Sequence, residues 1–376
     1  MLYIVTSSNS PCPGSALGEP CFTLQQYAAN PSRDTNVTLE LEAGQHNFLS
    51  GTLEISNIEA LRIIANEATI MCTQYGSYIN INSVQNVQMS GAMFFNCRVA
   101  VRDSHTFVLE DSRVLYSTLS IESLRNATIR DSYISFNGQY SLRVAQSSSA
   151  VIERCTFADT IVTGSPGGSI WGSRSNITII NSSFSNISGI ANALYVERSE
   201  SYILIINSTF TANKIASSYG FFVTGGIVNV QSGSIAVYGS NFTNNSVSGS
   251  GGVFSATSVN LFVSNSVFIK NSAGVNGGVV YISGASSYSS YSSQKTSVSI
   301  DRSSFISNFA NESGGVMHVS VDAVSVCHSY FFNNTARFGG GGVLFLEKQS
   351  SNASFSDSAF SNNSAAYCGV LEADTQ

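Results

Sequence analysis

The chain has 376 residues, a formal net charge of −6 and only 11% charged side chains. Its 17 Lys and Arg residues form no basic run, so we expect no nucleic-acid partner and no electrostatic binding to anionic membranes. No stretch approaches the roughly 18 apolar residues that span a bilayer, so no transmembrane segment is expected within this chain.

The first 36 residues (1–36) are expected to form an N-terminal capping segment. Cys12 and Cys21 bracket a Pro/Gly-containing stretch, and Phe22–Ala29 has the pattern of a short amphipathic helix. A stacked-coil fold needs such a cover, because its first coil otherwise exposes unpaired backbone groups and apolar side chains. We predict a Cys12–Cys21 disulfide that pins the helix; two unpaired thiols in a flexible leader are the alternative.

Apolar columns recur from about residue 37 at intervals of 20 to 27 residues. Apolar pairs separated by one polar residue, such as Leu61/Ile63 and Val87/Met89, show the period of a strand with one buried face. Five positions after each pair comes a single apolar residue. The members of that column before residue 205 are Phe94, Val114, Ile134, Phe157 and Phe184.

From about residue 205 two marks recur in step, at intervals of 26 to 37 residues. A serine lies two residues before each Phe of a Phe-x-x-Asn phrase, which predicts a bend between two short strands. The phrase and a Gly-Gly-aliphatic triplet both repeat, which indicates one supersecondary unit stacked many times. The phrases are Phe210/Asn213, Phe242/Asn245, Phe268/Asn271, Phe305/Asn308, Phe331/Asn334 and Phe360/Asn363, and the triplets begin at Gly225, Gly251, Gly277, Gly314 and Gly341.

These columns predict an all-β fold, a single-stranded right-handed parallel β-helix (a solenoid) over residues 37–376 with a short N-terminal helical cap. We expect its C-terminal end to be truncated within a coil. Low charge fits this fold, since charged columns would repel at every coil whereas Ser, Thr and Asn ladders hydrogen-bond to themselves. A leucine-rich repeat fold is disfavoured because its Leu/Asn phrase is absent. Barrels and propellers are disfavoured because sequences typical of hairpin turns are scarce.

Further cysteines bear on the compartment of the protein. Cys72 and Cys97 lie about one coil apart, within reach of the roughly 4.4–6.8 Å Cα separation that a disulfide tolerates, so a bridge and two free thiols both stay open. Cys155 replaces a ladder serine and is expected as a buried free thiol. The pairing of Cys327 and Cys368 stays open. The chain start is too short for a signal-peptide core, so we expect a fragment of a longer secreted or cell-surface protein.

Glycosylation sequons agree with secretion but arise often by chance in a chain this rich in Asn, Ser and Thr. The candidates are Asn36, Asn126, Asn176, Asn181, Asn186, Asn207, Asn241, Asn244, Asn311, Asn333, Asn352 and Asn362. An insertion over Gly284–Gln294 predicts a loop, and a merely mobile segment is favoured there. A loop in which Tyr288 and Tyr291 contact a partner or a glycan is the alternative.

Carboxylates and histidines give no convincing catalytic set. Asp111 and Asp131 share a column three residues before the apolar site, with Asp301 and Asp357 near it, and a turn role is favoured over a calcium or sugar site. His328 falls in the same bend column, where no partner carboxylate is predicted. His318 and Trp171 are expected in structural roles, with a sugar-stacking platform as the alternative for Trp171.

The repeat phrases resemble those of the polymorphic outer-membrane protein family, as in Phe210-Thr-Ala-Asn213, Gly251-Gly-Val-Phe254 and Phe268-Ile-Lys-Asn271. The resemblance covers residues 205–376 well. Residues 85–205 resemble the pectin-lyase-like pattern more loosely. The resemblance to the polymorphic outer-membrane protein repeats implies a surface β-helix. The phrase Cys21-Phe-Thr-Leu-Gln-Gln-Tyr27 is more similar to secreted eukaryotic proteins that carry this repeat.

Pectin-lyase-like relatives include enzymes that cleave acidic polysaccharides, yet their catalytic phrases are absent here. Glycoside cleavage needs two carboxylates at a defined separation or a metal-assisted base. We therefore expect no catalytic, metal or cofactor site, and a non-catalytic extracellular or cell-surface module for adhesion, recognition or structural scaffolding. Its partner would be a glycan or a cell-surface protein. A polysaccharide lyase or glycoside hydrolase is the alternative.

Overall fold

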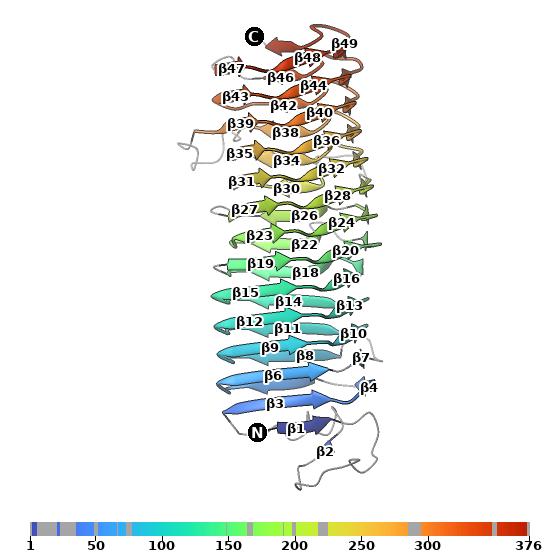
Figure 1. The fold of residues 1–376 in the computed structure, drawn as a ribbon, viewed down its shortest axis with the longest axis vertical. Helices are drawn as coiled ribbons and strands as arrows, with labels where there is room; N and C mark the ends of the chain where they lie inside the picture. Colours follow the sequence, from blue (N-terminus) through green and yellow to red (C-terminus); the bar gives the residue numbers. More distant parts are fainter. Residues whose placement is uncertain are drawn as a thin grey trace.

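The computed structural model describes residues 2–5, 21–22, 35–48, 52–65, 67–72, 77–147, 149–163, 168–190, 192–197, 201–216, 225–284, 295–347 and 352–373. These residues form a parallel β-helix, a rod of stacked coils with its ends far apart (Figure 1). Each coil contributes one strand to each of three long sheets, named A, B and C. We number the coils 1 to 13, each beginning with a strand of sheet A from β3 onward.

Sheet A holds the apolar pairs predicted from the sequence. Leu61 pairs with Val87, and Ile203 with Ile235, in parallel register. Alternate residues point inward, which gives the predicted burial period of two. Its strands are, in order, β2 (Cys21–Phe22), β1 (Leu2–Val5), β3 (Asn36–Leu41), β6 (Ala60–Ala65), β9 (Asn86–Ser90), β12 (Thr106–Glu110), β15 (Asn126–Arg130), β19 (Ser149–Glu153), β23 (Ile177–Ile180), β27 (Ser201–Ile206), β31 (Gly233–Tyr238), β35 (Val259–Ser264), β39 (Ser297–Asp301), β43 (Ala323–Cys327) and β47 (Asn352–Ser356).

Sheet B carries the phenylalanine column on short strands. Most of them have three residues because only the central side chain points into the core, as Phe268 does in β36. Its strands are β4 (Gly44–Phe48), β7 (Ala68–Cys72), β10 (Met93–Phe95), β13 (Arg113–Leu115), β16 (Tyr133–Ser135), β20 (Thr156–Ala158), β24 (Ser183–Ser185), β28 (Thr209–Thr211), β32 (Asn241–Thr243), β36 (Val267–Ile269), β40 (Ser304–Ile306), β44 (Tyr330–Phe332) and β48 (Ala359–Ser361).

Sheet C closes each coil and returns the chain to sheet A. Its strands are β5 (Thr52–Ser56), β8 (Tyr78–Asn82), β11 (Arg98–Arg102), β14 (Thr118–Glu122), β18 (Tyr140–Ala145), β22 (Gly168–Ser173), β26 (Asn192–Glu197), β30 (Val228–Val230), β34 (Phe254–Thr257), β38 (Val280–Ser283), β42 (Met317–Val319), β46 (Leu344–Leu346) and β50 (Leu371–Ala373).

A fourth sheet of two-residue strands, sheet D, lies between sheets B and C and begins only at coil 5. In coils 3 and 4, whose connections are fully described, the chain turns from sheet B to sheet C without such a strand. The strands are β17 (Asn137–Gly138), β21 (Ile161–Val162), β25 (Ser188–Gly189), β29 (Lys214–Ile215), β33 (Ser246–Val247), β37 (Ser272–Ala273), β41 (Phe309–Ala310), β45 (Thr335–Ala336) and β49 (Ser364–Ala365).

The bend between sheets A and B is made by one residue in the left-handed region. Asp111 (φ 48°), Asn207 (φ 47°) and Asn265 (φ 49°) are examples, and their short polar side chains tolerate this conformation. The left-handed backbone at Asp111 and its column confirms the turn role that the sequence favoured. Arg302 and His328 occupy the same column at φ 45° and 50°, which places long side chains on an exposed ridge.

The inner face of sheet B is one continuous stack of phenylalanine rings. From Phe157 to Phe360, successive ring centroids lie 4.5–4.9 Å apart and the rings are nearly parallel. This spacing equals the strand separation of a sheet, about 4.8 Å. Each ring therefore packs on its copy in the coil above and below, and Phe268 has no exposed surface.

A buried asparagine ladder follows the phenylalanine stack. Asn271 Oδ1 accepts hydrogen bonds from the backbone N–H and the Nδ2 of Asn245, at 3.2 and 2.9 Å. Asn271 Nδ2 donates in turn to Asn308 Oδ1 and to the carbonyl of Phe242. The ladder thus satisfies buried backbone groups at a corner where strand pairing is interrupted.

Asn363, the last residue of the ladder, departs from the buried pattern of the others. Its Oδ1 accepts hydrogen bonds from the backbone N–H and the Nδ2 of Asn334, at 3.0 and 2.9 Å. Its Nδ2 donates to the carbonyl of Phe331 at 2.9 Å, so the predicted ladder contacts are present. Contrary to the expected inward burial, however, Asn363 is only partly buried, as is Phe360. The physical reason is that no further coil of the described residues stacks on sheet B beyond β48.

The Gly-Gly-aliphatic triplet marks the tight entry to sheet C. Gly251 adopts φ 76°, and a Cβ there would lie 2.2 Å from the carbonyl oxygen of Phe254. At Gly252 the obstacle is the next coil, since a Cβ would lie 2.1 Å from the oxygen of Gly278. The first glycine is required by the backbone conformation and the second by coil-to-coil contact.

The N-terminal end differs from the predicted helical cap. Phe22, expected to begin a helix, lies in strand β2, and residues 23–29 of that helix lie outside the described residues. The described residues contain no helix, and therefore none that could cross a membrane. Strand β1 pairs with β3 and extends sheet A, so backbone groups at this edge are satisfied by strand pairing.

The ladder generates a first prediction. Phe268→Ala should lower the free energy of unfolding by about 3–5 kcal/mol, because it removes one ring from a closed stack. Asn271→Ala should cost about 1–3 kcal/mol, because buried backbone groups lose their partner. The measurement is the midpoint and slope of chemical denaturation.

Tyr330→Ala is the matched control, since Tyr330 lies in the same sheet, points outward and is 39% exposed. Its cost should stay near 0.5 kcal/mol, the rough size of a surface change. Equal midpoints for Phe268→Ala and Tyr330→Ala would contradict the inward-facing stack.

Candidate functional site

A groove exists where the coils change length. In coils 3 and 4 two residues join sheet B to sheet C, residues 96–97 and 116–117. The same connection covers residues 73–77 in coil 2, 136–139 in coil 5 and 159–167 in coil 6. Ser77, Phe136, Gly138 and Thr163 belong to the longer connections, and together with the two short ones they line a depression with a volume of about 770 Å³.

The floor of the groove is the outer face of sheet C. One outward column of this sheet runs through Asn80, Ala100, Ser120, Arg143 and Trp171 in consecutive coils. Its smallest members lie in coils 3 and 4, beneath the short connections, and its largest lie in coils 5 and 6. The outer surface of the rod therefore steps down at coils 3 and 4 and rises again toward the tryptophan.

The groove carries a positive excess in a protein of negative net charge. Among its described lining residues, the charged ones are Arg98, Arg102, Arg143 and Glu122. Glu122 ion-pairs with both Arg102, at 3.4 Å, and Arg143. Burial and the nearby charge of Arg102 lower the pKa of the Arg143 guanidinium. Two arginines thus share one lining carboxylate, and Glu197, which does not line the groove, adds a negative charge near Arg143.

Aromatic rings form the two ends of the groove. At one end Arg98 donates to the Tyr78 hydroxyl at 2.6 Å and lies over its ring. At the other end Tyr140 lines the groove and contacts the Trp171 ring, which lies outside the lining. The Arg143 guanidinium lies 4.8 Å from the centroid of that Trp171 ring. Arginine–aromatic contacts of this kind orient the guanidinium while leaving the ring edge accessible.

Tyr116 lies at the short corner of coil 4 and is 54% exposed beside the groove. It adopts φ 50°, which is unusual for a tyrosine, and its ring packs edge-to-face on Phe95. A large aromatic side chain exposed on a tight turn offers an apolar surface to a ligand. The arrangement can therefore bind a ligand that combines an anionic group with a flat apolar face.

The groove offers little for cleavage chemistry. Glu122 is the one carboxylate among its described lining residues, and it is held by two arginines. Acid–base cleavage of a glycosidic bond needs a second carboxyl group at a defined distance. The site is better suited to holding an anion than to transferring a proton.

The carboxylates proposed from the sequence are separate from the groove. Asp131 accepts hydrogen bonds from Arg154 Nε and Nη2 at 2.6 and 2.7 Å, and this pair holds the pKa of its carboxyl below the usual value. Asp111 is an exposed bend residue. Neither Asp111 nor Asp131 lines the groove. The groove was not found from the sequence because it depends on loop lengths and on outward-facing side chains, which form no sequence motif.

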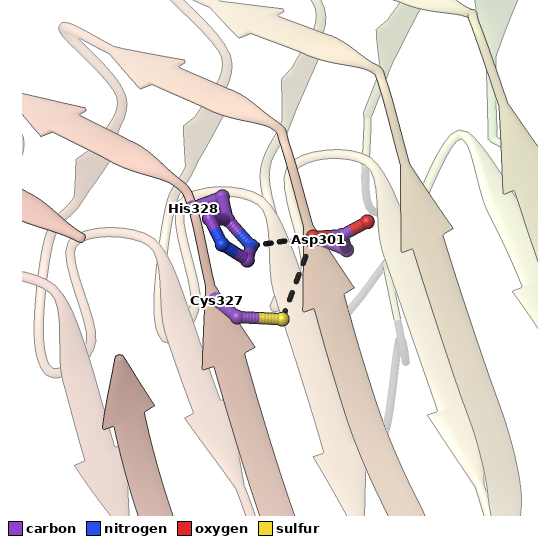
Figure 2. Close-up of side chains that lie close together, drawn as sticks. All are labelled: Asp301, Cys327 and His328. Atoms are coloured by element: carbon purple, nitrogen blue, oxygen red, sulfur yellow. Dashed lines mark hydrogen bonds and ion pairs between the residues drawn. The ribbon is translucent and has the colours of Figure 1, made fainter. Parts of the chain in front are cut away.

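The two histidines singled out from the sequence, His318 and His328, lie on different parts of the coil. His318, in β42, is buried between the rings of Tyr281 and Phe345 on sheet C. His328, in the bend after β43, lies 3.2 Å from Asp301 Oδ1, and Cys327 Sγ lies 3.5 Å from the same oxygen (Figure 2). The expectation that His328 has no carboxylate partner is therefore wrong, because Asp301 is stacked one coil before it.

Five cysteines of the described part of the chain divide into one bridge and three free thiols. Cys72 and Cys97 form a disulfide with a Cα separation of 5.0 Å, and Cys97 belongs to the short corner of the groove. Cys155 is free and buried in the serine ladder, and burial raises the pKa of its thiol to about 11. The predicted Cys12–Cys21 bridge lies outside the described residues, because Cys12 does.

Sequon asparagines and ladder asparagines occupy different surfaces. Eleven sequon residues are exposed and Asn311 is partly exposed, whereas the ladder residues from Asn213 to Asn334 are buried. None of the twelve lies in a strand of sheet C, the sheet that forms the groove floor. The candidate binding residues Tyr288 and Tyr291 lie outside the described residues.

Comparisons with known proteins support the fold. A family model described as a right handed beta helix region matches residues 117–294. Together with the stacked parallel sheets, this gives a right-handed parallel β-helix. The narrower resemblance to polymorphic outer-membrane protein repeats stays a prediction. A search of curated proteins found no significant match.

Among solved structures, the surface adhesin PfbA of Streptococcus pneumoniae is 14% identical over 88% of this chain and 83% of its own, with a TM-score of 0.45. A family 28 exopolygalacturonase of Yersinia enterocolitica is 9% identical over 94% and 75%, with a TM-score of 0.39. A mannuronic acid specific polysaccharide family 6 lyase from human gut microbiota is 9% identical over 95% and 87%, at 0.38. Similarities of this size carry no argument about activity.

The disulfide beside the groove generates a second prediction. Replacing both Cys72 and Cys97 by Ala should lower the free energy of unfolding by about 2–4 kcal/mol. The reason is that the bridge closes a loop with a sequence separation of 25 in the unfolded chain. Denaturation under non-reducing conditions measures it, and Cys155→Ala, which removes a free buried thiol, is the control. A double variant with the wild-type midpoint would contradict a bridge that constrains the unfolded chain.

Proposed function

We propose that this protein is a non-catalytic recognition module of the extracellular or cell-surface space, and that the groove on sheet C binds an acidic glycan. The observation that carries the proposal is the combination of three arginines, one glutamate and aromatic end walls in one depression. Adhesion, or a scaffold that displays this groove, is the role such a module would perform.

The chemistry of acidic sugars matches the groove. Their carboxylate or sulfate groups pair well with guanidinium donors, whose planar fork binds two oxygens at once. Their C–H faces pack on aromatic rings, which Tyr116 and Tyr78 present at the groove with 54% and 37% exposure. An extended chain could follow the rod across several coils, because equivalent positions recur about every 4.8 Å.

Binding rather than cleavage is favoured by the state of Glu122. Its carboxylate is committed to Arg102 and Arg143 and accepts a further hydrogen bond from the Ser120 hydroxyl. A carboxylate with three donors is stabilised in its ionised form and is a poor proton donor. No second lining carboxylate among the described residues can complete an acid–base pair.

An extracellular location is supported by the Cys72–Cys97 disulfide, since such bridges persist mainly in oxidising compartments. The placement of the sequons agrees with it. Glycans attached at those asparagines would be anchored outside the strands of sheet C, including those of the groove floor. The face we propose for recognition thus carries no sequon in its strands.

A glycan-binding comparison tests the proposal. The purified chain is titrated with polyuronates, sulfated glycans and neutral glucans, and Kd is measured by calorimetry at low and physiological salt. We expect binding to the acidic polymers only. Arg98→Gln and Tyr116→Ala should each weaken it about tenfold, equivalent to roughly 1.4 kcal/mol.

Arg113→Gln is the matched control. Arg113 and Arg98 are each the exposed first residue of a short strand, β13 on sheet B and β11 on sheet C. Arg113→Gln therefore removes the same charge at a position that does not line the groove. Equal weakening by Arg113→Gln and Arg98→Gln would indicate general charge attraction and overturn the assignment of the groove. Binding of a cell-surface protein in place of any glycan would also overturn it.

The same samples test the enzymatic alternative. Incubation with each polymer should release neither reducing ends nor unsaturated products. Turnover that disappears in Glu122→Gln would contradict a non-catalytic module and favour a lyase or hydrolase.

A further inference from the structure

The outer ridge where sheet A bends into sheet B gathers three different ligand-type side chains in coils 11 and 12. Asp301 and Cys327 are the last residues of β39 and β43 and are paired in register. His328 follows directly, in the left-handed bend at φ 50°. Figure 2 shows the thiol and the imidazole both directed at the carboxylate of the neighbouring strand.

The two distances from the carboxylate oxygen to the other ligand atoms match the edges of one coordination sphere, and the third distance is at most 4.8 Å. Asp301 Oδ1 lies 3.2 Å from His328 Nδ1 and 3.5 Å from Cys327 Sγ, and all three atoms lie within 4.8 Å of one another. A tetrahedral zinc ion with Zn–N and Zn–O of about 2.0–2.1 Å and Zn–S of about 2.3 Å has edges of about 3.3–3.6 Å. The existing side chains therefore need only small movements to reach a common ion.

Outer contacts already orient two of the three ligands. Arg302 Nη1 donates to Asp301 Oδ2 at 2.9 Å, which directs Oδ1 toward the cysteine and histidine. Asp357, in the bend of the next coil, places Oδ2 3.7 Å from His328 Nε2. A carboxylate behind the second nitrogen of a ligating histidine is the usual support of a metal-bound imidazole.

We propose that Asp301, Cys327 and His328 form a binding site for a divalent cation of the zinc class, with its remaining position open to water. Sulfur and nitrogen ligands select zinc, cobalt and similar ions and disfavour calcium and magnesium, which take oxygen ligands. On binding, the Cys327 thiol releases its proton to solvent and coordinates as thiolate. The ion would join coils 11 and 12 at the surface.

A nucleophilic Cys–His–Asp arrangement is less consistent with the geometry. Such a site places the cysteine sulfur against a histidine nitrogen, and the carboxylate behind the histidine. Here sulfur and nitrogen both contact the same carboxylate oxygen. Convergence on one oxygen is the arrangement expected around an ion. The exposure of Asp301, 20%, and of His328, 52%, leaves room for a water ligand.

Titration of the full chain with Co²⁺ tests the site directly. We expect about one tightly bound ion per chain, with a thiolate-to-cobalt charge-transfer band in the near ultraviolet and the visible bands of a tetrahedral site. Zn²⁺ should displace it. Cys327→Ser should abolish the charge-transfer band, and His328→Asn and Asp301→Asn should weaken binding at least tenfold. Asp357→Asn should weaken it about tenfold, as for other outer-shell partners.

The chain supplies its own controls. Cys368→Ser removes an exposed free thiol elsewhere and should leave the band unchanged. His328→Asn keeps a residue type that the same bend column already uses at Asn207 and Asn265, so the backbone is preserved. Persistence of the band in Cys327→Ser, its loss in Cys368→Ser, or no saturable band in the wild-type chain would overturn the proposal.

A second measurement covers the case in which Cys327→Ser does not fold. In the wild-type chain, Zn²⁺ should slow the alkylation of Cys327 at least tenfold and leave that of Cys368 unchanged, as measured by mass spectrometry. Equal slowing at both cysteines, or none at Cys327, would contradict the site.

Discussion

The constraint on which the structure depends is that every inward side chain must pack on its own equivalent one coil away. The coil spacing of about 4.8 Å is set by backbone hydrogen bonds, so the core can hold only columns that tolerate self-contact at that distance. Phenylalanine rings do so by parallel stacking, and asparagine amides by donating to the next amide. Charged residues cannot, and this explains why so few are present.

Residues in the outward columns and at the corners do not have to pack on their own equivalents, so these are the positions available for function. Coil length can vary at a corner without disturbing the core, because insertions leave the register of the flanking strands intact. The groove arises in this way, from short corners at Cys97 and Tyr116 between longer ones. The Asp301 cluster arises from the outward ends of sheet A strands, where unlike residues such as Asp301 and Cys327 are stacked.

The core was accessible from the sequence because stacking repeats the same chemistry at each coil. The apolar-pair columns placed Leu61 against Val87, and the Phe-x-x-Asn phrases placed Phe268 against Phe305; the structure pairs both. The groove could not be found in this way, because its charged and aromatic residues do not recur at the same position in successive coils. His328 was judged partnerless because Asp301 lies a coil away in sequence. Phe22, expected to begin a helix, lies in a strand instead, because backbone groups there pair with β1.

The register of sheet B is the central claim, and disulfide trapping between coils tests it most directly. In a background lacking Cys327 and Cys368, the outward-facing pair Thr243→Cys and Ile269→Cys is paired in register between β32 and β36. It should oxidise rapidly. Thr243→Cys with Val267→Cys uses the same face two residues out of register, at roughly 7–8 Å, and should stay reduced. Preferential oxidation of the displaced pair would contradict the stacked columns.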